Sequence, residues 1–351
     1  MRGPRPRIGG RRKATSGHRH DELEWARGLV LASAVAASEN WSSQGVCLSA
    51  SLAAERVRQH RAWRSQLGDS PTSPSLDGRV AAVSEMHKLN EISLGERRRR
   101  LGFRDGAKGT HSSRTLMLGE LELLLSEARP EMSIADYRKL VVDENVLGKP
   151  TYTTREHTVR KLKALYGLEP EIPIFRTLVR LWPLDHDSHP LLALLAGYAR
   201  DPLLRLLASP VLDAPVGSVV SAPALIAEAE RVVPGRFSET NLRAIASRVL
   251  STFLQSGHLD GRSEKRRVRV SATTVAASYA FFLAYLEGFR AQRIFTSVWP
   301  ALLDLRDDRL PEVAFDAARR GLMDYRQVGN VIELRFPNWL STKEEQLTRD
   351  Q

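Results

Sequence analysis

The stretch SETNLRAIASRVLSTFLQSGHLDGRSEKRRVRVSA, Ser238 to Ala272, decides the fold that we expect for this chain. Its first half has an N-capping serine at Ser238, apolar residues at helical spacing and a terminating Gly257, which together predict one helix. The Asp-Gly dipeptide that follows predicts a tight turn between two short strands. Another helix, capped by Ser221, is predicted just before this stretch. Helix, turn, helix and hairpin in this order are typical of a winged helix.

The outer face of the predicted helix carries small and hydrogen-bonding groups, which would let its backbone approach a DNA groove closely. The face comprises Thr240, Asn241, Ala244, Ser247, Arg248, Ser251 and Gln255. Among these, Asn241, Ser247 and Arg248 are candidate DNA contacts.

The hairpin adds a basic tip, which suits phosphate contacts beside a groove. We expect Val268 and Val270 to point inward, so that Arg267 and Arg269 point outward. The candidate phosphate contacts of the hairpin are Arg262, Lys265, Arg266, Arg267 and Arg269. Two alternatives stay open. Winged-helix units also bind other proteins, and basic residues on a strand edge often serve solubility.

A basic helix is also predicted in TYTTREHTVRKLKALYGLEP, Thr151 to Pro170. Thr153 and Glu156 have capping-box spacing, and Gly167 ends the helix. A helix in SIADYRKLVVDEN, capped by Ser133, and a Gly-Pro turn precede it, which is the outline of a helix-turn-helix. Candidate DNA contacts on and before this basic helix are Lys149, Arg155, His157, Arg160, Lys161 and Lys163. The alternative is a basic face that is only solvated.

The rest of the chain predicts a mainly α fold, a helical bundle with small β-hairpins. Residues 1–116 form a basic head that we expect to be largely disordered, residues 117–218 a helical domain, and residues 219–351 a winged-helix-like and C-terminal domain. LMDYRQVGNVIELRFP predicts a hairpin with Ile332, Leu334 and Phe336 on its buried side.

Composition limits the classes of function. The formal charge is +11, but residues 1–116 hold 21 basic against 11 acidic residues, and the remainder 31 against 30, so local clusters carry the argument for a polyanionic partner. The single Cys47 excludes an internal disulfide and fits a cytoplasmic protein. The longest uncharged run, residues 270–286, is short for a membrane span and predicts a buried helix.

Sequence motifs of catalysis are not found, so we expect no enzyme, no cofactor and no metal site. LDHDSHP, Leu184 to Pro190, holds two His and two Asp, but Asp and Ser before a helix-opening Pro favour an N-terminal cap over metal ligands.

Three stretches together resemble the BrxA family of bacterial BREX phage-exclusion systems. They are DENVLGKPTYTTREHTVRKL, PLLALLAGYARDPLLRLLASPVL and FSETNLRAIASRVLSTFLQSGHLDG, which lie in this order between Asp143 and Gly261. The resemblance implies a mostly helical protein with a helix-turn-helix-like part and a bundle similar to that of the antitermination factor NusB. It also implies a non-enzymatic role at DNA in a phage-defence operon. The long basic head departs from the compact pattern of that family.

Two functions follow as expectations. The first is a DNA-binding accessory or regulatory protein that binds double-stranded DNA and other phage-defence proteins. The second is a scaffold whose winged-helix units bind protein partners. Strongly salt-dependent binding is expected of the first, because Arg and Lys contacts release counterions from DNA.

Overall fold

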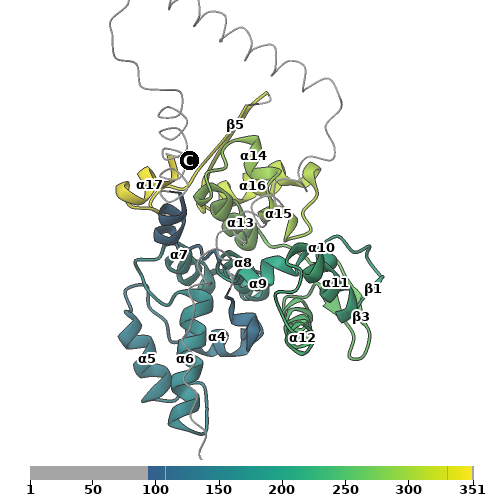
Figure 1. Cartoon of the computed structure of the whole chain (residues 1–351). Helices are drawn as coiled ribbons and strands as arrows, with labels where there is room; N and C mark the ends of the chain where they lie inside the picture. The colour runs from purple at the N-terminus through teal and green to yellow at the C-terminus, as the bar shows by residue number, and fades with distance from the viewer. Residues whose placement is uncertain (1–93, 107, 330, 350–351) are drawn as a thin grey trace, which may run out of the picture.

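The computed structural model describes residues 94–106, 108–329 and 331–349, and these form a mainly helical body with two small antiparallel sheets (Figure 1). The mainly α expectation with small hairpins is therefore confirmed. The expectation for residues 1–93 lies outside the described residues.

The first part of the body is helical. Residues 94–101 are helical and precede η1 (Thr110–Ser112). The helices that follow are α4 (Leu118–Leu125), α5 (Ile134–Val142), α6 (Tyr152–Tyr166), α7 (Pro173–Leu181), η2 (Trp182–Leu184), η3 (His186–Ser188), α8 (His189–Arg200), α9 (Pro202–Leu206) and α10 (Ser209–Leu212). In Figure 1, α5 and α6 lie side by side at one end of the molecule.

The middle of the chain alternates strands and helices. Its elements are β1 (Val219–Val220), α11 (Ala222–Val232), α12 (Glu239–Gln255), β2 (Leu259–Asp260) and β3 (Lys265–Arg267). The sheet order is β1-β3-β2, with both pairs antiparallel. Arg266 of β3 lies opposite Val219 on one side and Asp260 on the other.

The C-terminal part packs helices against a second sheet. Its elements are α13 (Thr274–Leu286), α14 (Gln292–Phe295), α15 (Val298–Ala301), η4 (Asp307–Arg309), α16 (Leu310–Arg319), β4 (Asp324–Val328), β5 (Val331–Arg335) and α17 (Thr342–Arg349). Ile332, Leu334 and Phe336 are buried, as the alternation predicts. The hairpin of β4 and β5 projects from the body in Figure 1.

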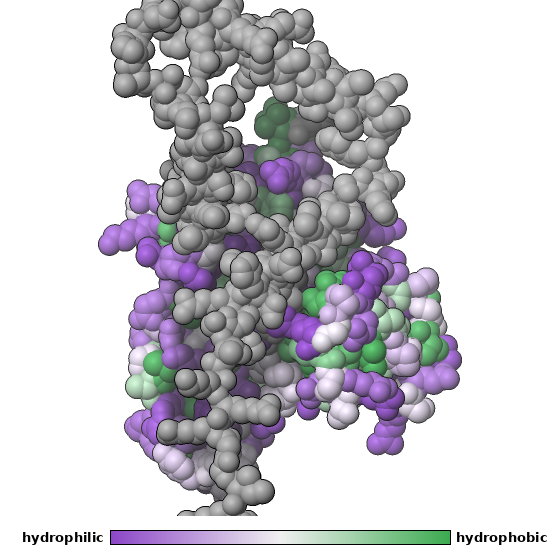
Figure 2. Space-filling model, viewed as in Figure 1, coloured by the Kyte–Doolittle hydropathy of each residue, from purple (hydrophilic) through white to green (hydrophobic). Residues whose placement is uncertain are grey.

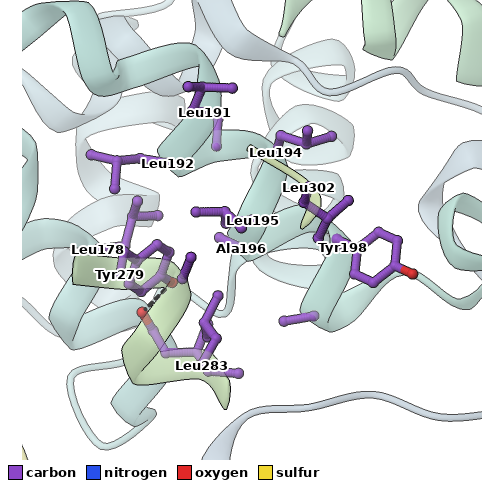
Figure 3. Packing of buried hydrophobic residues seen from close by; sticks show 14 of the residues in the cluster. Leu178, Leu191, Leu192, Leu194, Leu195, Ala196, Tyr198, Tyr279, Leu283 and Leu302 are labelled. Atoms are coloured by element: carbon purple, nitrogen blue, oxygen red, sulfur yellow. Dashed lines mark hydrogen bonds between the residues drawn. The ribbon is translucent and has the colours of Figure 1, made fainter. Parts of the chain in front are cut away.

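The core is built around α8 and α13, the two helices that are buried on nearly every side. Leu192 and Leu195 of α8 lie toward Tyr279 and Leu283 of α13 (Figure 3). The hydroxyl of Tyr279 donates a hydrogen bond of 2.8 Å to the carbonyl of Ile174, which satisfies this polar group inside the core. The expectation of a buried helix at 270–286 is therefore confirmed over α13.

The body begins earlier than the expected boundary at residue 117. Leu101, Phe103 and Leu116 are buried in the common core, and the guanidinium of Arg200 donates to the carbonyl of Gly102. Disorder was expected because residues 94–116 contain few apolar residues. Those few are buried by α8 and by residues far along the chain. Residues 94–106 and 108–116 thus belong to the fold.

The helix caps were predicted with mixed success. Ser133 caps α5 in a full capping box with Asp136, and Ser238 caps α12 by accepting from the Asn241 amide. The α6 capping box was wrong, because Thr151 is the N-cap and Glu156 pairs with Arg138 of α5 instead. Ser221 makes no capping hydrogen bond. Each side-chain cap contributes about 1 kcal/mol to the stability of its helix.

Candidate nucleic-acid interface

The basic residues of α6 divide into those held by the protein and those that face solvent. Arg155 is held, since its guanidinium donates to the carbonyls of Val142 at 3.0 Å and Lys149 at 3.1 Å. It therefore fixes the turn between α5 and α6. These two hydrogen bonds use Nε and Nη1 and leave the N–H groups of Nη2, so a contact of Arg155 with DNA stays a prediction.

Two lysines near α6 are neutralised by carboxylates. The ammonium of Lys149 lies 3.0 Å from Glu120 Oε1, and that of Lys163 lies 2.6 Å from Glu169 Oε1. In contrast, His157 and Arg160 are exposed, and Lys161 is half-buried. None of these three residues makes an ion pair within the part of the chain that the structure describes. The basic face of α6 is thus narrower than the sequence predicts.

A groove lies beside this face. It has a volume of about 490 Å³ and runs between α6, the segment before and within η1, α9 and the turn between α11 and α12. Its lining residues are Arg104, Lys108, Gly109, Thr110, Ser112, Lys161, Ala164, Leu203, Arg236 and Phe237. Of the residues predicted as DNA contacts, only Lys161 lines it, because the other walls come from chain segments that no local pattern connects to α6.

The outer face of α12 is only partly open. Asn241 and Ser247 are exposed, as expected. Arg248 instead donates a hydrogen bond of 2.7 Å to the carbonyl of Ser112, and Gln255 donates to Thr115 Oγ1 at 3.1 Å. The segment around η1 thus covers the C-terminal half of the face and engages one nitrogen of the Arg248 guanidinium, so the contact of Arg248 with DNA stays a prediction.

A buried polar network holds η1 against α12. His111 Nδ1 lies 2.9 Å from Asp201 Oδ2, and His111 Nε2 lies 2.8 Å from Thr252 Oγ1. Asp201 also caps α9 by accepting from the amides of Leu203 and Leu204. Burial alone would raise the pKa of Asp201, but the charge and hydrogen bonds of His111, with the Leu204 amide, lower it.

The order Thr252, His111, Asp201 is the order of groups in a nucleophile, base and acid triad. All three side chains are fully buried, so no substrate reaches the Thr252 hydroxyl, and the network acts in folding. Gly109 makes room for it, because a Cβ at this position would lie 2.0 Å from Asp201 Oδ1. Sequence reasoning missed the network, whose members lie far apart in the chain.

The hairpin of β2 and β3 presents a basic tip with one exception. Arg262 and Arg266 are exposed near the turn, and Figure 2 shows hydrophilic residues there. Arg269 is also exposed, but it follows the end of β3 at the base of the hairpin. Arg266 pairs with Glu264 at 2.6 Å, and the ammonium of Lys265 folds back onto the Gly261 carbonyl at 2.6 Å. These two cations therefore reach a phosphate only by exchanging these partners.

Arg267 is the exception, and the expectation that it points outward to DNA is wrong. It is 2% exposed and pairs with Asp304, just after α15. The strand β3 ends at Arg267, so the expected alternation with Val268 and Val270 does not continue along a ladder. His258, just before β2, strengthens the same junction through a contact of 2.9 Å between its Nε2 and the Leu302 carbonyl.

Burial lowers the pKa of His258 to about 4, so this imidazole is neutral near pH 7. The neutral ring with its proton on Nε2 donates to the Leu302 carbonyl, which can only accept. The hairpin is therefore fixed to the C-terminal part of the body by one neutral and one charged contact.

LDHDSHP is a local structural element. Asp185 caps η3 by accepting from the Asp187 amide and from the Ser188 hydroxyl, while the ring of His189 stacks on Trp182 at 3.9 Å. Ser188 does not cap α8, contrary to expectation. Among the described residues no group of three or more His, Cys, Asp and Glu side chains is arranged to hold a metal ion.

Comparison with known proteins gives no match: neither a protein-family model nor a curated protein matches this chain. Within the described ranges no helix combines the length and the apolar character that crossing a bilayer requires.

Proposed function

We propose that this chain is a non-enzymatic DNA-binding accessory or regulatory protein of a BREX-like phage-defence system. The proposal assigns double-stranded DNA as the main partner, with other phage-defence proteins as further partners in the cytoplasm. It takes β1, α11, α12, β2 and β3 as a winged helix, in which α12 is the helix that approaches the groove and the β2–β3 hairpin is the wing.

The element order supports this assignment. A strand, two helices and a hairpin follow one another, and the first strand pairs with the last, which gives the sheet order β1-β3-β2. The N-terminal half of α12, with Asn241 and Ser247, is exposed and carries hydrogen-bonding side chains that suit base edges. Phosphate contacts flanking the helix would position it.

The single observation that carries the proposal is the pair of exposed cations at the two ends of the wing, Arg262 in its turn and Arg269 just after β3. Both are exposed and make no ion pair within the described ranges. Their long charged side chains are therefore available for phosphates. On α6, Arg160 and His157 add a second exposed basic face that is independent of the wing.

Fluorescence anisotropy of the full chain with a labelled duplex, across a salt series, tests the proposal. We expect the double variant Arg262→Glu/Arg269→Glu to weaken binding and to reduce the slope of log K against log salt by about 0.9 for each lost phosphate contact. Arg319→Glu is the control, because Arg319 is exposed and belongs to α16, which lies apart from the wing in Figure 1. Equal losses in the wing variant and in the control would contradict a wing contact.

A protein scaffold is the second candidate, and the β4–β5 hairpin favours it. Val328 and Val331 are cross-strand partners at its tip and are 80% and 72% exposed. Apolar groups at such exposure suit burial by a partner protein. Binding of a defence protein that responds little to salt and is lost in Val328→Lys would favour this function over DNA binding.

A further inference from the structure

The groove between α6 and the α11–α12 turn has the charge of an anion site. Arg104, Lys108, Lys161 and Arg236 line it, and none of its lining residues is acidic. Arg104 is held in place by a hydrogen bond of 2.7 Å to the Ala164 carbonyl. Lys108 and Lys161 make no ion pair within the described ranges, so both ammonium groups are available to a ligand.

A second hollow in the molecule has a different charge. The hollow near α17 has a similar volume of about 410 Å³, but Glu171 and Glu344 line it together with Arg176. Arg176 is paired with Glu344 at 2.7 Å, so the charge there is largely neutralised. An anion would find no comparable attraction in that hollow.

The groove also has an apolar side. Ala164, Leu203 and Phe237 line it, and the Arg236 guanidinium lies over the Phe237 ring with its Cζ 5.2 Å from the ring centroid. An aromatic ring beside a guanidinium is a surface on which a nucleobase stacks. Basic groups for a phosphate therefore lie next to an apolar surface for a base.

The size of the groove selects the ligand. A volume of about 490 Å³ lies within the range of about 300–1,000 Å³ typical of small-molecule sites. This volume accommodates one nucleotide. The bases of a duplex are stacked and paired inside the helix, so a base reaches Phe237 only where its nucleotide is unpaired.

We propose that this groove binds one unpaired nucleotide of a DNA strand, with its phosphate at Lys108, Lys161 and Arg104 and its base against Phe237 and Leu203. The inference rests on the proposed DNA binding for the source of the strand. It predicts that the preferred ligand is a duplex with a single-stranded extension, in which α12 and the wing hold the duplex and the groove holds the extension.

The test measures the affinity of the full chain for two labelled duplexes. One duplex is blunt, and the other has the same sequence with a short single-stranded thymidine extension. We expect the extension to tighten binding about tenfold, as stacking of a base on an aromatic side chain does. Phe237→Leu is expected to remove most of this gain and to leave blunt duplex binding unchanged. Lys161→Gln is expected to weaken binding of the extended duplex more than that of the blunt duplex, and Arg319→Gln is the control.

Each result decides one way. If both duplexes bind equally in the wild type and in both groove variants, the groove proposal is overturned while the proposed function stands. If neither duplex binds, the proposed function fails as well. Free thymidine monophosphate can be tested as a competitor of the extended duplex. If it competes as well as a thymidine strand does, the groove binds a free nucleotide, and the assignment to a DNA strand is overturned. If Phe237→Leu lowers thermal stability, the loss of binding is judged from Lys161→Gln, which removes one charge and no apolar contact.

Discussion

Arg267 donates to both carboxylate oxygens of Asp304, and through this pair the strand β3 is joined to the segment after α15. Asp304 also accepts from the amide of Val270 at 3.0 Å, so one carboxylate satisfies the backbone just beyond the hairpin. A side chain that seemed from the sequence to belong to a DNA-facing strand is therefore part of the core.

The Arg267–Asp304 pair gives the first prediction. Arg267→Ala leaves Asp304 without its cation in a half-enclosed site, and we expect a loss of about 3–5 kcal/mol in the free energy of unfolding. Urea unfolding measures it. The double variant Arg267→Met/Asp304→Asn should recover part of this loss and bind DNA as the wild type does, because asparagine keeps an acceptor for the Val270 amide and tolerates the φ of 53° at this position. A specific loss of DNA affinity in the stable double variant would restore Arg267 as a contact.

Gly109 gives a prediction with a matched control. Because a Cβ would lie 2.0 Å from Asp201 Oδ1, Gly109→Ala should disturb the His111–Asp201–Thr252 network and lower stability by about 1–3 kcal/mol. Gly119→Ala in α4 meets nothing within 4 Å and should stabilise by about 0.5–1 kcal/mol. Thermal unfolding of both variants checks the pair, and an unchanged Gly109→Ala protein would contradict the tight contact.

The His258 contact predicts a pH dependence. Its folded pKa of about 4 lies below the usual 6.5, so the unfolded chain binds the proton more readily, and stability falls as pH drops from about 6.5 to about 4. The full effect of His258 is about 3 kcal/mol, at 1.36 kcal/mol for each unit of pKa. Urea unfolding at a series of pH values should show a shallower loss in His258→Gln than in the wild type. Burial also lowers the pKa of His189, which adds a loss of the same sign in both proteins.

The basic residues of α6 should differ in their effect on DNA binding. Arg160→Gln removes an exposed cation and should reduce the salt slope by about 0.9, whereas Lys163→Gln removes a cation already paired with Glu169 and should change the slope little. Anisotropy with the full chain and one duplex measures both. Equal slopes for the two variants would show that α6 does not lie against the DNA backbone.

Local signals in the sequence predicted the elements better than the site. Ser238, Gly257 and the Asp-Gly turn predict α12 and the β2–β3 hairpin, because caps and tight turns depend on a few neighbouring residues. The direction of Arg267 could not be predicted, because its partner Asp304 lies 37 residues away. Burial of Phe103 and the covering of Arg248 by Ser112 depend in the same way on contacts between distant segments.

The groove illustrates the same limit. Lys161 is prominent in a basic helix, whereas Lys108 and Phe237 stand in stretches with no pattern that relates them to α6. Folding brings Lys108, Lys161 and Phe237 together as lining residues of the same groove. A search of the sequence for aromatic residues next to basic ones would have found the pair Arg236 and Phe237. It would not have shown that this pair lies in the same groove as Lys161 of α6.

The segment from Arg104 to Thr115 touches both proposed contact elements, since Arg104 bonds to the Ala164 carbonyl of α6 and Ser112 and Thr115 accept from α12. It therefore acts as a spacer between them. Because His111 of this segment is buried between Asp201 and Thr252, and Gly109 has no room for a Cβ, the segment holds the spacing of α6 and α12 fixed. On the proposed function, the length of DNA between the two contacts is therefore set by the packed fold rather than by an adjustable linker.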